Sequence, residues 1–160
     1  QALAQFEFPV NGWSRSPKAI GGIRTFSGQN GFHDFLAASR VLVNLLPLTP
    51  DTQNILNRDT LSRLQPGGYL INVARGAHLV EDDLLALLDS GHLAGATLDV
   101  FRTEPLSAGH PFWTHPRIVA TPHTSARTLR DESIAQIAGK IAALARGEAI
   151  AGVVNLERGY

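Results

Sequence analysis

The apolar run Tyr69-Leu70-Ile71-Asn72-Val73-Ala74, near the middle of the chain, limits the fold more than any other segment. It follows the turn signal Pro66-Gly67-Gly68 and contains β-branched residues, which is typical of a strand buried on both faces of a parallel sheet. The run stops at Arg75-Gly76, so a cation stands at the carboxyl end of the strand, where open α/β sheets bind their ligands. Arg75 could bind a carboxylate or phosphate through two parallel hydrogen bonds, or it could simply end the strand and pair with a surface acid.

Strand and helix patterns alternate along the chain at short intervals. Further strands are predicted at residues 8–13, 41–46, 95–100 and 118–121, with a short extended piece at 23–26. Helices are predicted at residues 32–39, between Asn57 and Pro66, from Glu81 to a stop at Gly91, and at residues 128–146. This alternation predicts an α/β fold with a parallel, doubly wound sheet.

The overall charge and composition exclude several classes of function. Of the 160 residues, 44% are hydrophobic and 18% are charged, and the formal net charge is zero. With no basic block, binding to nucleic acid or to an anionic membrane surface has no electrostatic support, and no apolar run approaches the ~20 residues of a membrane span. The absence of cysteine excludes disulfides and thiolate metal sites. We therefore expect no nucleic-acid partner and no membrane partner.

Four polar residues follow the ends of predicted strands: Arg75, Asp99, Glu104 and His123. The strands of a parallel sheet point the same way, so their carboxyl ends lie along one edge. A cation, a histidine and a carboxylate in one cleft can bind an anionic substrate and transfer a proton. Each residue alone could be an ordinary polar loop residue, but their recurrence at successive strand ends favours a catalytic site.

Other patterns of catalytic or binding residues are missing from the sequence. His33, His78, His92, His110 and His115 form no convincing set of metal ligands, so we expect no metal site. There is no Gly-x-Ser-x-Gly elbow for a nucleophilic serine. There is also no Gly-x-Gly-x-x-Gly loop, which by itself weakens a nucleotide-binding hypothesis.

Several motifs in order resemble the nucleotide-binding part of the D-isomer-specific 2-hydroxyacid dehydrogenases. These motifs are Leu46–Thr52, Asn72–Gly76, Leu98–Phe101 with Glu104-Pro105, and Thr121-Pro122-His123. Within that family, Trp13–Ser16, Val80–Leu85 and Arg158–Tyr160 are most similar to the glyoxylate/hydroxypyruvate reductase A branch. The resemblance covers essentially the whole chain and implies a Rossmann-type sheet.

The resemblance implies a hydride transfer between a nicotinamide cofactor and a small 2-keto or 2-hydroxy acid, such as glyoxylate or hydroxypyruvate. Carried over by motif, Arg75 would bind the substrate carboxylate and polarise the carbonyl. His123 would be the acid/base that protonates the carbonyl oxygen during reduction. Glu104 would pair with His123, which favours the imidazolium form and fixes the ring.

The same carry-over assigns residues to the cofactor. Leu46 and Pro47 would line its adenosine side and Asp99 would face its nicotinamide side, while Val73 and Ala74 of the central motif would also contact it. The hydride chemistry belongs to the cofactor, and the protein supplies position and a proton.

Cofactor preference depends on the residues after the strand that ends at Trp13, because the end of this strand meets the adenosine ribose in dinucleotide-binding folds. NAD-preferring sites commonly place an acid there, but this sequence has hydroxyls and cations: Ser14, Arg15, Ser16 and Lys18. These groups fit the 2′-phosphate of NADP, so we expect NADPH to be preferred over NADH, with NAD as a second cofactor. The alternative is a solvated basic turn without a ligand.

The chain is about half as long as members of this family. Gln1–Phe6 are helix formers without a cap and the chain has no methionine, so we interpret it as a fragment or processed product. The resemblance places the first strand and the Gly-rich loop in the missing part, with that strand lying between the strands near Val10 and Val41. Residues 1–125 would be a partial NAD(P)-binding domain, and residues 126–160 a helix and tail that pack on the substrate domain.

Two functions stay open at this point. The chain is either part of a reductase, cytoplasmic and homodimeric when complete, or a non-catalytic α/β module that binds a nucleotide or another ligand. The fragment alone is expected to be inactive, and the sequence does not distinguish one keto acid from another.

Overall fold

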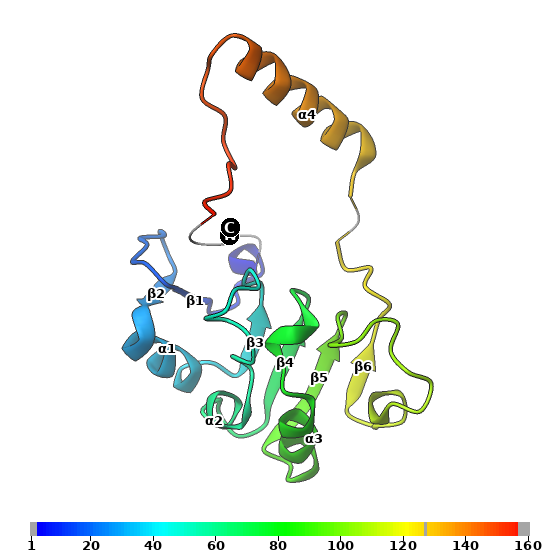
Figure 1. Cartoon of the computed structure of the whole chain (residues 1–160). Helices are drawn as coiled ribbons and strands as arrows, with labels where there is room; N and C mark the ends of the chain where they lie inside the picture. Colours follow the sequence, from blue (N-terminus) through cyan, green and yellow to red (C-terminus); the bar gives the residue numbers. More distant parts are fainter. Residues whose placement is uncertain (1–2, 127, 157–160) are drawn as a thin grey trace. The chain divides into compact units, whose positions relative to one another are not determined.

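The computed structural model describes residues 3–126 and 128–156, which divide into two compact units at the Pro122–His123 junction. The first unit contains, in chain order, η1 (Leu3–Phe6), β1 (Asn11–Ser14), β2 (Arg24–Ser27), α1 (Gly28–Ala37), β3 (Val41–Asn44), α2 (Arg58–Leu61), β4 (Gly68–Asn72), η2 (Gly76–His78), α3 (Glu81–Asp89), β5 (Leu93–Leu98), η3 (Pro111–Trp113) and β6 (Ile118–Ala120). The second unit contains α4 (Arg130–Ala145) (Figure 1).

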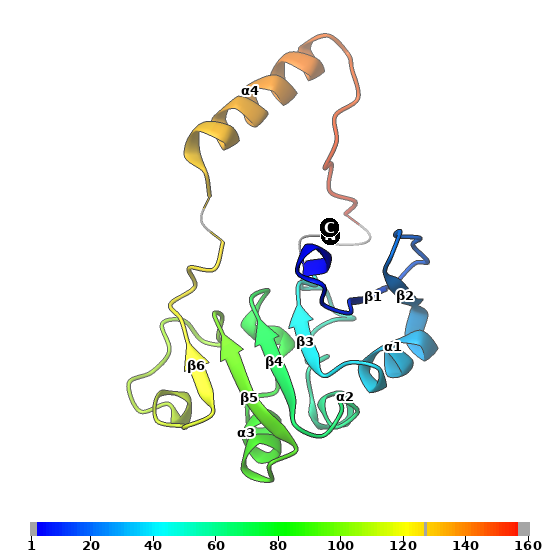
Figure 2. The ribbon, with the colours of Figure 1, turned by 180° about the vertical axis from the view of Figure 1, so that it is seen from behind.

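The strands of the first unit form two parallel sheets. β1 pairs with β2, and β3, β4, β5 and β6 pair in that order (Figures 1 and 2). In the larger sheet, Leu42, Leu70, Ala96 and Ile118 lie side by side in register. The predicted α/β fold with parallel, Rossmann-like pairing is therefore confirmed. The boundary between the two sheets falls between β1 and β3, where the resemblance places a missing strand.

The hydrophobic core lies against one face of the larger sheet. Leu70 of β4 is fully buried, together with Leu61 of α2 and Leu84 of α3. Figures 1 and 2 show α3 on this face of the strands. On the opposite face, Val43 of β3 and Val119 of β6 are 39% and 54% exposed. Within the part of the unit that the structure describes, burial is therefore concentrated on the helix-covered face.

Several element boundaries differ from the predicted ranges, among them the start of β1 and the end of α2. The first strand begins at Asn11 instead of residue 8, and Pro9 has no N–H to donate to a neighbouring strand. Asn57 caps α2 as predicted, through reciprocal hydrogen bonds with Thr60. However, α2 is a single turn that ends at Leu61, earlier than expected.

The second unit presents an exposed apolar stripe on α4. The stripe consists of Ile134, Ile137, Ile141 and Leu144, which are 55–63% exposed. No residue of α4 is buried, so the stripe does not form a core of its own unit. Packing of α4 on a substrate domain stays a prediction. Among the described residues, no helix combines the length and the apolar character that a bilayer crossing needs.

Candidate functional site

The carboxyl ends of β4, β5 and β6 lie along one edge of the larger sheet. These strands are adjacent and parallel, so the segments that follow them leave the sheet on the same side. Asp99 N–H donates to the Asn72 carbonyl at 3.0 Å, and Thr121 N–H donates to the Leu98 carbonyl at 3.0 Å. The predicted convergence of strand ends is therefore present for the segments that begin at Val73, Asp99 and Thr121.

Gly76 brings the Arg75 turn into direct contact with the segment that follows β5. A Cβ at Gly76 would lie 1.9 Å from the Phe101 carbonyl carbon and 2.4 Å from the Arg102 nitrogen. Only a residue without a side chain allows this approach. The contact joins the turn that carries Arg75 to the loop that carries Glu104.

Two asparagines at paired positions hold the segment before Gly76. Asn44 ends β3, Asn72 ends β4, and the two are partners in the sheet register. Asn72 is fully buried; its Oδ1 accepts from Asn44 Nδ2 at 3.0 Å and from Ala74 N–H at 3.3 Å, and its Nδ2 donates to the Arg75 carbonyl at 3.2 Å. A buried amide with all these partners fixes the path of residues 73–75. The signal for this network is an asparagine at the fourth position of each of two apolar runs, and sequence reasoning missed it.

His78 is a further residue that sequence reasoning missed. Its side chain is fully buried, with Nδ1 at 3.0 Å from Asn44 Nδ2 and at 3.1 Å from the Arg75 carbonyl oxygen. Its Nε2 lies 3.3 Å from the Pro47 carbonyl oxygen. His78 thus connects the Arg75 turn with the Leu46-Pro47 segment. No group of three or more metal-ligating side chains occurs among the described residues.

Arg75 and Glu104 are exposed, whereas Asp99 is buried. Arg75 Nη1 donates to the carbonyl of Ala74 at 2.6 Å, which folds the side chain over its own turn. Glu104 Oε1 accepts from Phe101 N–H at 2.9 Å, so one oxygen of the carboxylate closes its own loop. Asp99 is 1% exposed and accepts a hydrogen bond from the Thr121 hydroxyl.

His123 is the first residue of the second unit. Its φ of 54° lies in the left-handed region, which is uncommon for a residue with a side chain and is tolerated better by histidine than by most. The chain therefore turns sharply directly after β6 and Pro122. The pairing of His123 with Glu104 stays a prediction.

The basic turn after β1 lies close to the loop after β3. Ser14 Oγ donates to the Ser16 carbonyl at 2.8 Å, which closes the turn. Arg15 Nη1 lies 3.5 Å from Asp51 Oδ2, and both side chains are largely exposed. Asp51 belongs to the segment that begins with Leu46 and Pro47, so the structure joins two groups of residues that were predicted to bind one cofactor. Sequence reasoning missed this acid because it is distant in the chain.

The donors of this turn fit a phosphate group. Ser14, Arg15, Ser16 and Lys18 provide hydroxyl, guanidinium and ammonium groups, and the last three are exposed. The 3.5 Å separation and high exposure make the Arg15–Asp51 pair weak, so an anion can compete for the guanidinium.

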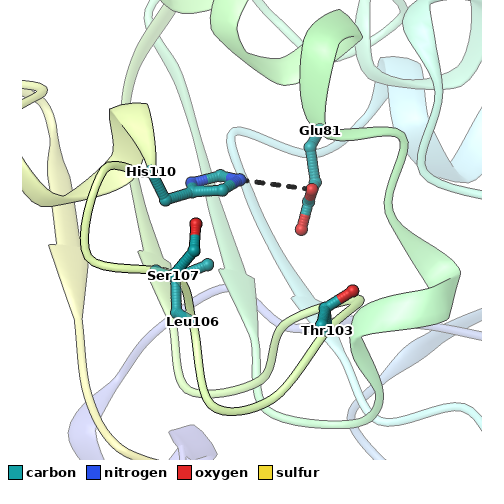
Figure 3. A pocket seen from close by; sticks show the side chains of 5 residues that line it. All are labelled: Glu81, Thr103, Leu106, Ser107 and His110. Atoms are coloured by element: carbon teal, nitrogen blue, oxygen red, sulfur yellow. Dashed lines mark ion pairs between the residues drawn. The ribbon is translucent and has the colours of Figure 1, made fainter.

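The loop between β5 and β6 is attached to both ends of α3 by histidines. His110 Nε2 lies 3.4 Å from Glu81 Oε2 at the start of the helix, and His115 Nε2 lies 3.3 Å from Asp89 Oδ1 at its end. Figure 3 shows Glu81 and His110 pointing toward one another across a small cavity, which Thr103, Leu106 and Ser107 also line. The cavity has a volume of about 210 Å³, below the roughly 300 Å³ at which small-molecule sites begin.

Comparison with known proteins gives a consistent result. The family model described as D-isomer specific 2-hydroxyacid dehydrogenase, NAD binding domain, matches residues 1–125. Proteins named glyoxylate/hydroxypyruvate reductase A from Serratia proteamaculans and Photorhabdus laumondii are 54% and 51% identical over 160 residues. Those residues are 100% of this chain and 51% of each relative, so the chain spans about half the length of the curated relatives it matches.

Solved structures with the same fold include two complexes with a nicotinamide cofactor. A D-isomer specific 2-hydroxyacid dehydrogenase from Xanthobacter autotrophicus Py2, in complex with NADPH and MES, superposes with a TM-score of 0.95 at 42% identity, over 99% of this chain and 65% of that chain. An NADPH-dependent glyoxylate/hydroxypyruvate reductase from Sinorhizobium meliloti, in complex with NADP and sulfate, also gives 0.95, at 40% identity, over 99% and 52%.

Proposed function

Because the chain belongs to the D-isomer-specific 2-hydroxyacid dehydrogenase family, we propose that it is the cofactor-binding and catalytic part of a reductase. The reaction reduces a small 2-keto acid, such as glyoxylate or hydroxypyruvate, with NADPH. The observation that carries the proposal is the backbone contact at Gly76, which joins the Arg75 turn to the Glu104 loop. A cation for the substrate carboxylate and a carboxylate for the acid/base are thereby presented from neighbouring strands.

Each proposed catalytic residue has one task. Arg75 binds the substrate carboxylate through two parallel hydrogen bonds and polarises the adjacent carbonyl. His123 gives a proton to the carbonyl oxygen, which becomes the hydroxyl of the product. Glu104 holds the ring of His123 in the orientation that proton transfer needs. Bound NADPH supplies the hydride that completes the 2-hydroxy acid.

The proposed cofactor contacts come from four segments of the first unit. Ser14, Arg15, Ser16 and Lys18 bind the 2′-phosphate, Leu46 and Pro47 line the adenosine, and Asp99 faces the nicotinamide side. Val73 and Ala74 also contact the cofactor. The exposed donors after β1 and the proximity of Asp51 to Arg15 support the placement of one ligand across the first two segments. Related structures that contain NADP or NADPH support the choice of cofactor.

A kinetic experiment separates this proposal from the non-catalytic alternative. The proposal assigns the chain to one half of a longer reductase, so the longer protein is purified and mixed with NADPH and glyoxylate. Glyoxylate-dependent loss of NADPH absorbance supports the reductase. Binding of NADPH without turnover of glyoxylate or hydroxypyruvate supports a ligand-binding module instead. The homodimer and the cytoplasmic location are further predictions, which light scattering and cell fractionation test.

A further inference from the structure

Glu81 attaches both ends of the loop that carries Glu104 to the start of α3. Its Oε1 accepts a hydrogen bond from Arg102 N–H at 3.3 Å, and its Oε2 lies 3.4 Å from His110 Nε2. The side chains of Glu81 and His110 are each 20% exposed. Glu104 lies in the chain between these two attachment points. One carboxylate therefore closes a loop of which Glu104 is a member. Figure 3 shows one of the two attachments, between Glu81 and His110.

The first attachment point is reinforced by the side chain of Arg102. Its Nη2 donates to the Leu79 carbonyl at 2.6 Å and to Oδ1 of Asn54. The backbone of Arg102 is thus held by Glu81 while its guanidinium is held by the segment just before Glu81. Because the Phe101 N–H donates to Glu104, a displacement of Arg102 moves the group that orients the Glu104 carboxylate.

The second attachment point depends on which nitrogen of His110 carries a proton. His110 Nδ1 accepts from Phe112 N–H at 3.3 Å, so the hydrogen directed at Glu81 is on Nε2. The imidazole ring also packs on the buried Phe112 ring at a centroid distance of 4.5 Å. His110 is therefore fixed by the core on one side and offers its donor to Glu81 on the other.

We infer that Glu81 is a positioning residue for the reaction, acting through Glu104, and that Arg102 and His110 are its two partners in this role. The inference rests on the proposed function, since it assumes that Glu104 serves the acid/base. Glu81 itself does not contact the reacting atoms. It holds the loop at the two points that fix where the Glu104 carboxylate lies. Glu81 lies in the first turn of α3, where the helix dipole stabilises the negative charge of its carboxylate.

The test is a double-mutant cycle between Glu81 and Glu104 in the longer protein. Glu81→Ala should lower kcat by about 10- to 100-fold, since small misplacements of catalytic groups have effects of that size, while KM for glyoxylate changes little. In a Glu104→Gln background, Glu81→Ala should lower kcat no further, because its effect passes through Glu104. Glu81→Gln should recover part of the loss, because its amide oxygen can still accept from Arg102 N–H.

Asp83→Ala is the matched control. Asp83 is in the same helical turn and also accepts a backbone N–H, from Arg58 at 2.9 Å, but it holds α2 instead of the Glu104 loop. This variant should keep kcat. Amide hydrogen exchange gives an independent readout: Glu81→Ala should speed exchange at Arg102, and Asp83→Ala should not.

The outcomes distinguish the inference from the function on which it rests. If Glu104→Gln lowers kcat but Glu81→Ala leaves it unchanged, or lowers it equally in both backgrounds, the positioning role is wrong and the reductase proposal stands. If Glu104→Gln has wild-type kinetics, the role of Glu104 and the inference both fail. Should Glu81→Ala not fold, His110→Phe keeps the ring on Phe112 but removes the donor. An unchanged kcat in that variant overturns the inference.

Discussion

Gly76 packs against Phe101 so closely that a side chain cannot fit between them. The Cβ of any other residue at position 76 would lie 1.9 Å from the Phe101 carbonyl carbon and 2.0 Å from its oxygen. Both atoms belong to the backbone, so no rotation of a side chain relieves the overlap. The turn that follows β4 and the loop that follows β5 are therefore fixed relative to one another by a glycine.

We expect Gly76→Ala to destabilise the chain and to displace Arg75. Backbone shifts that accommodate one added group cost about 1–3 kcal/mol, and here the obstacle is a peptide unit. Urea unfolding of the purified chain measures the loss. Gly109→Ala is the control, because no heavy atom lies within 4 Å of a Cβ added there. Equal stability of the two variants would contradict the contact at Gly76.

Arg15 is expected to determine the preference for NADPH. A hydrogen bond to a charged group contributes roughly 1.5–3 kcal/mol, which corresponds to a preference of about 10- to 100-fold. Arg15→Ala in the longer protein should lose most of this preference through weaker NADPH binding, with NADH binding little changed. Arg24→Ala removes the same charge from β2, where the guanidinium lies over the Phe26 ring, and should keep the preference. An unchanged ratio of dissociation constants in Arg15→Ala excludes the assignment.

The neighbouring acid allows a second test of the same turn. Asp51 Oδ2 lies 3.5 Å from Arg15 Nη1, so it competes with a bound phosphate for the guanidinium. Asp51→Asn should therefore tighten NADPH binding more than NADH binding, by a factor of a few, since exposed pairs contribute at most about 1 kcal/mol. Weaker NADPH binding in this variant would show that Asp51 supports the cofactor site instead of competing with it.

The sheet could be predicted from the sequence because its strands are short apolar runs bounded by Pro and Gly. Tyr69-Leu70-Ile71 after Pro66-Gly67-Gly68 is an example, and it became β4. The placement of Arg75 and Asp99 after neighbouring strands followed from the same pattern, since parallel strands share one carboxyl edge. The positions of the strands and of the residues that follow them can both be read from the order of residue types along the chain.

The groups that hold the site could not be predicted in the same way. His78 contacts Asn44 and Pro47 from a distance of about thirty residues, and its role depends on complete burial. Glu81 was interpreted as a helix-opening acid, which it is, but its carboxylate also meets His110. His110 and His115 have no acid close to them in the sequence, and the acids that they contact, Glu81 and Asp89, lie on α3. Contacts between residues that are distant in the chain leave no periodic pattern in the sequence, so pattern analysis does not detect them.

The isolated 160 residues are expected not to reduce glyoxylate. The sequence contains no Gly-rich phosphate loop, which is the main anchor of a dinucleotide in this fold. β1 and β3 also belong to separate sheets. No backbone hydrogen bonds between these two strands therefore hold the proposed cofactor residues that follow β1 next to those that follow β3. The assay compares glyoxylate-dependent NADPH oxidation by the chain and by the longer protein. Equal rates would show that nothing essential lies outside these residues.

Arg75→Lys tests the proposed two-point binding of the substrate carboxylate. A lysine keeps the charge but cannot form two parallel hydrogen bonds, so kcat/KM for glyoxylate should fall about 10-fold or more. Arg63→Lys is the control, since Arg63 is exposed on the surface and pairs with Asp59 one helical turn away. Wild-type kcat/KM in Arg75→Lys would remove the carboxylate-binding role.

The turnover of His123→Ala in the longer protein tests the central claim most directly. General acid–base groups contribute at least about 100-fold, so steady-state NADPH oxidation with glyoxylate should fall by that factor or more while NADPH binding is retained. His33→Ala, on α1, should turn over at the wild-type rate. A His123→Ala enzyme that reduces glyoxylate within a few-fold of wild type would contradict the proposed catalytic site.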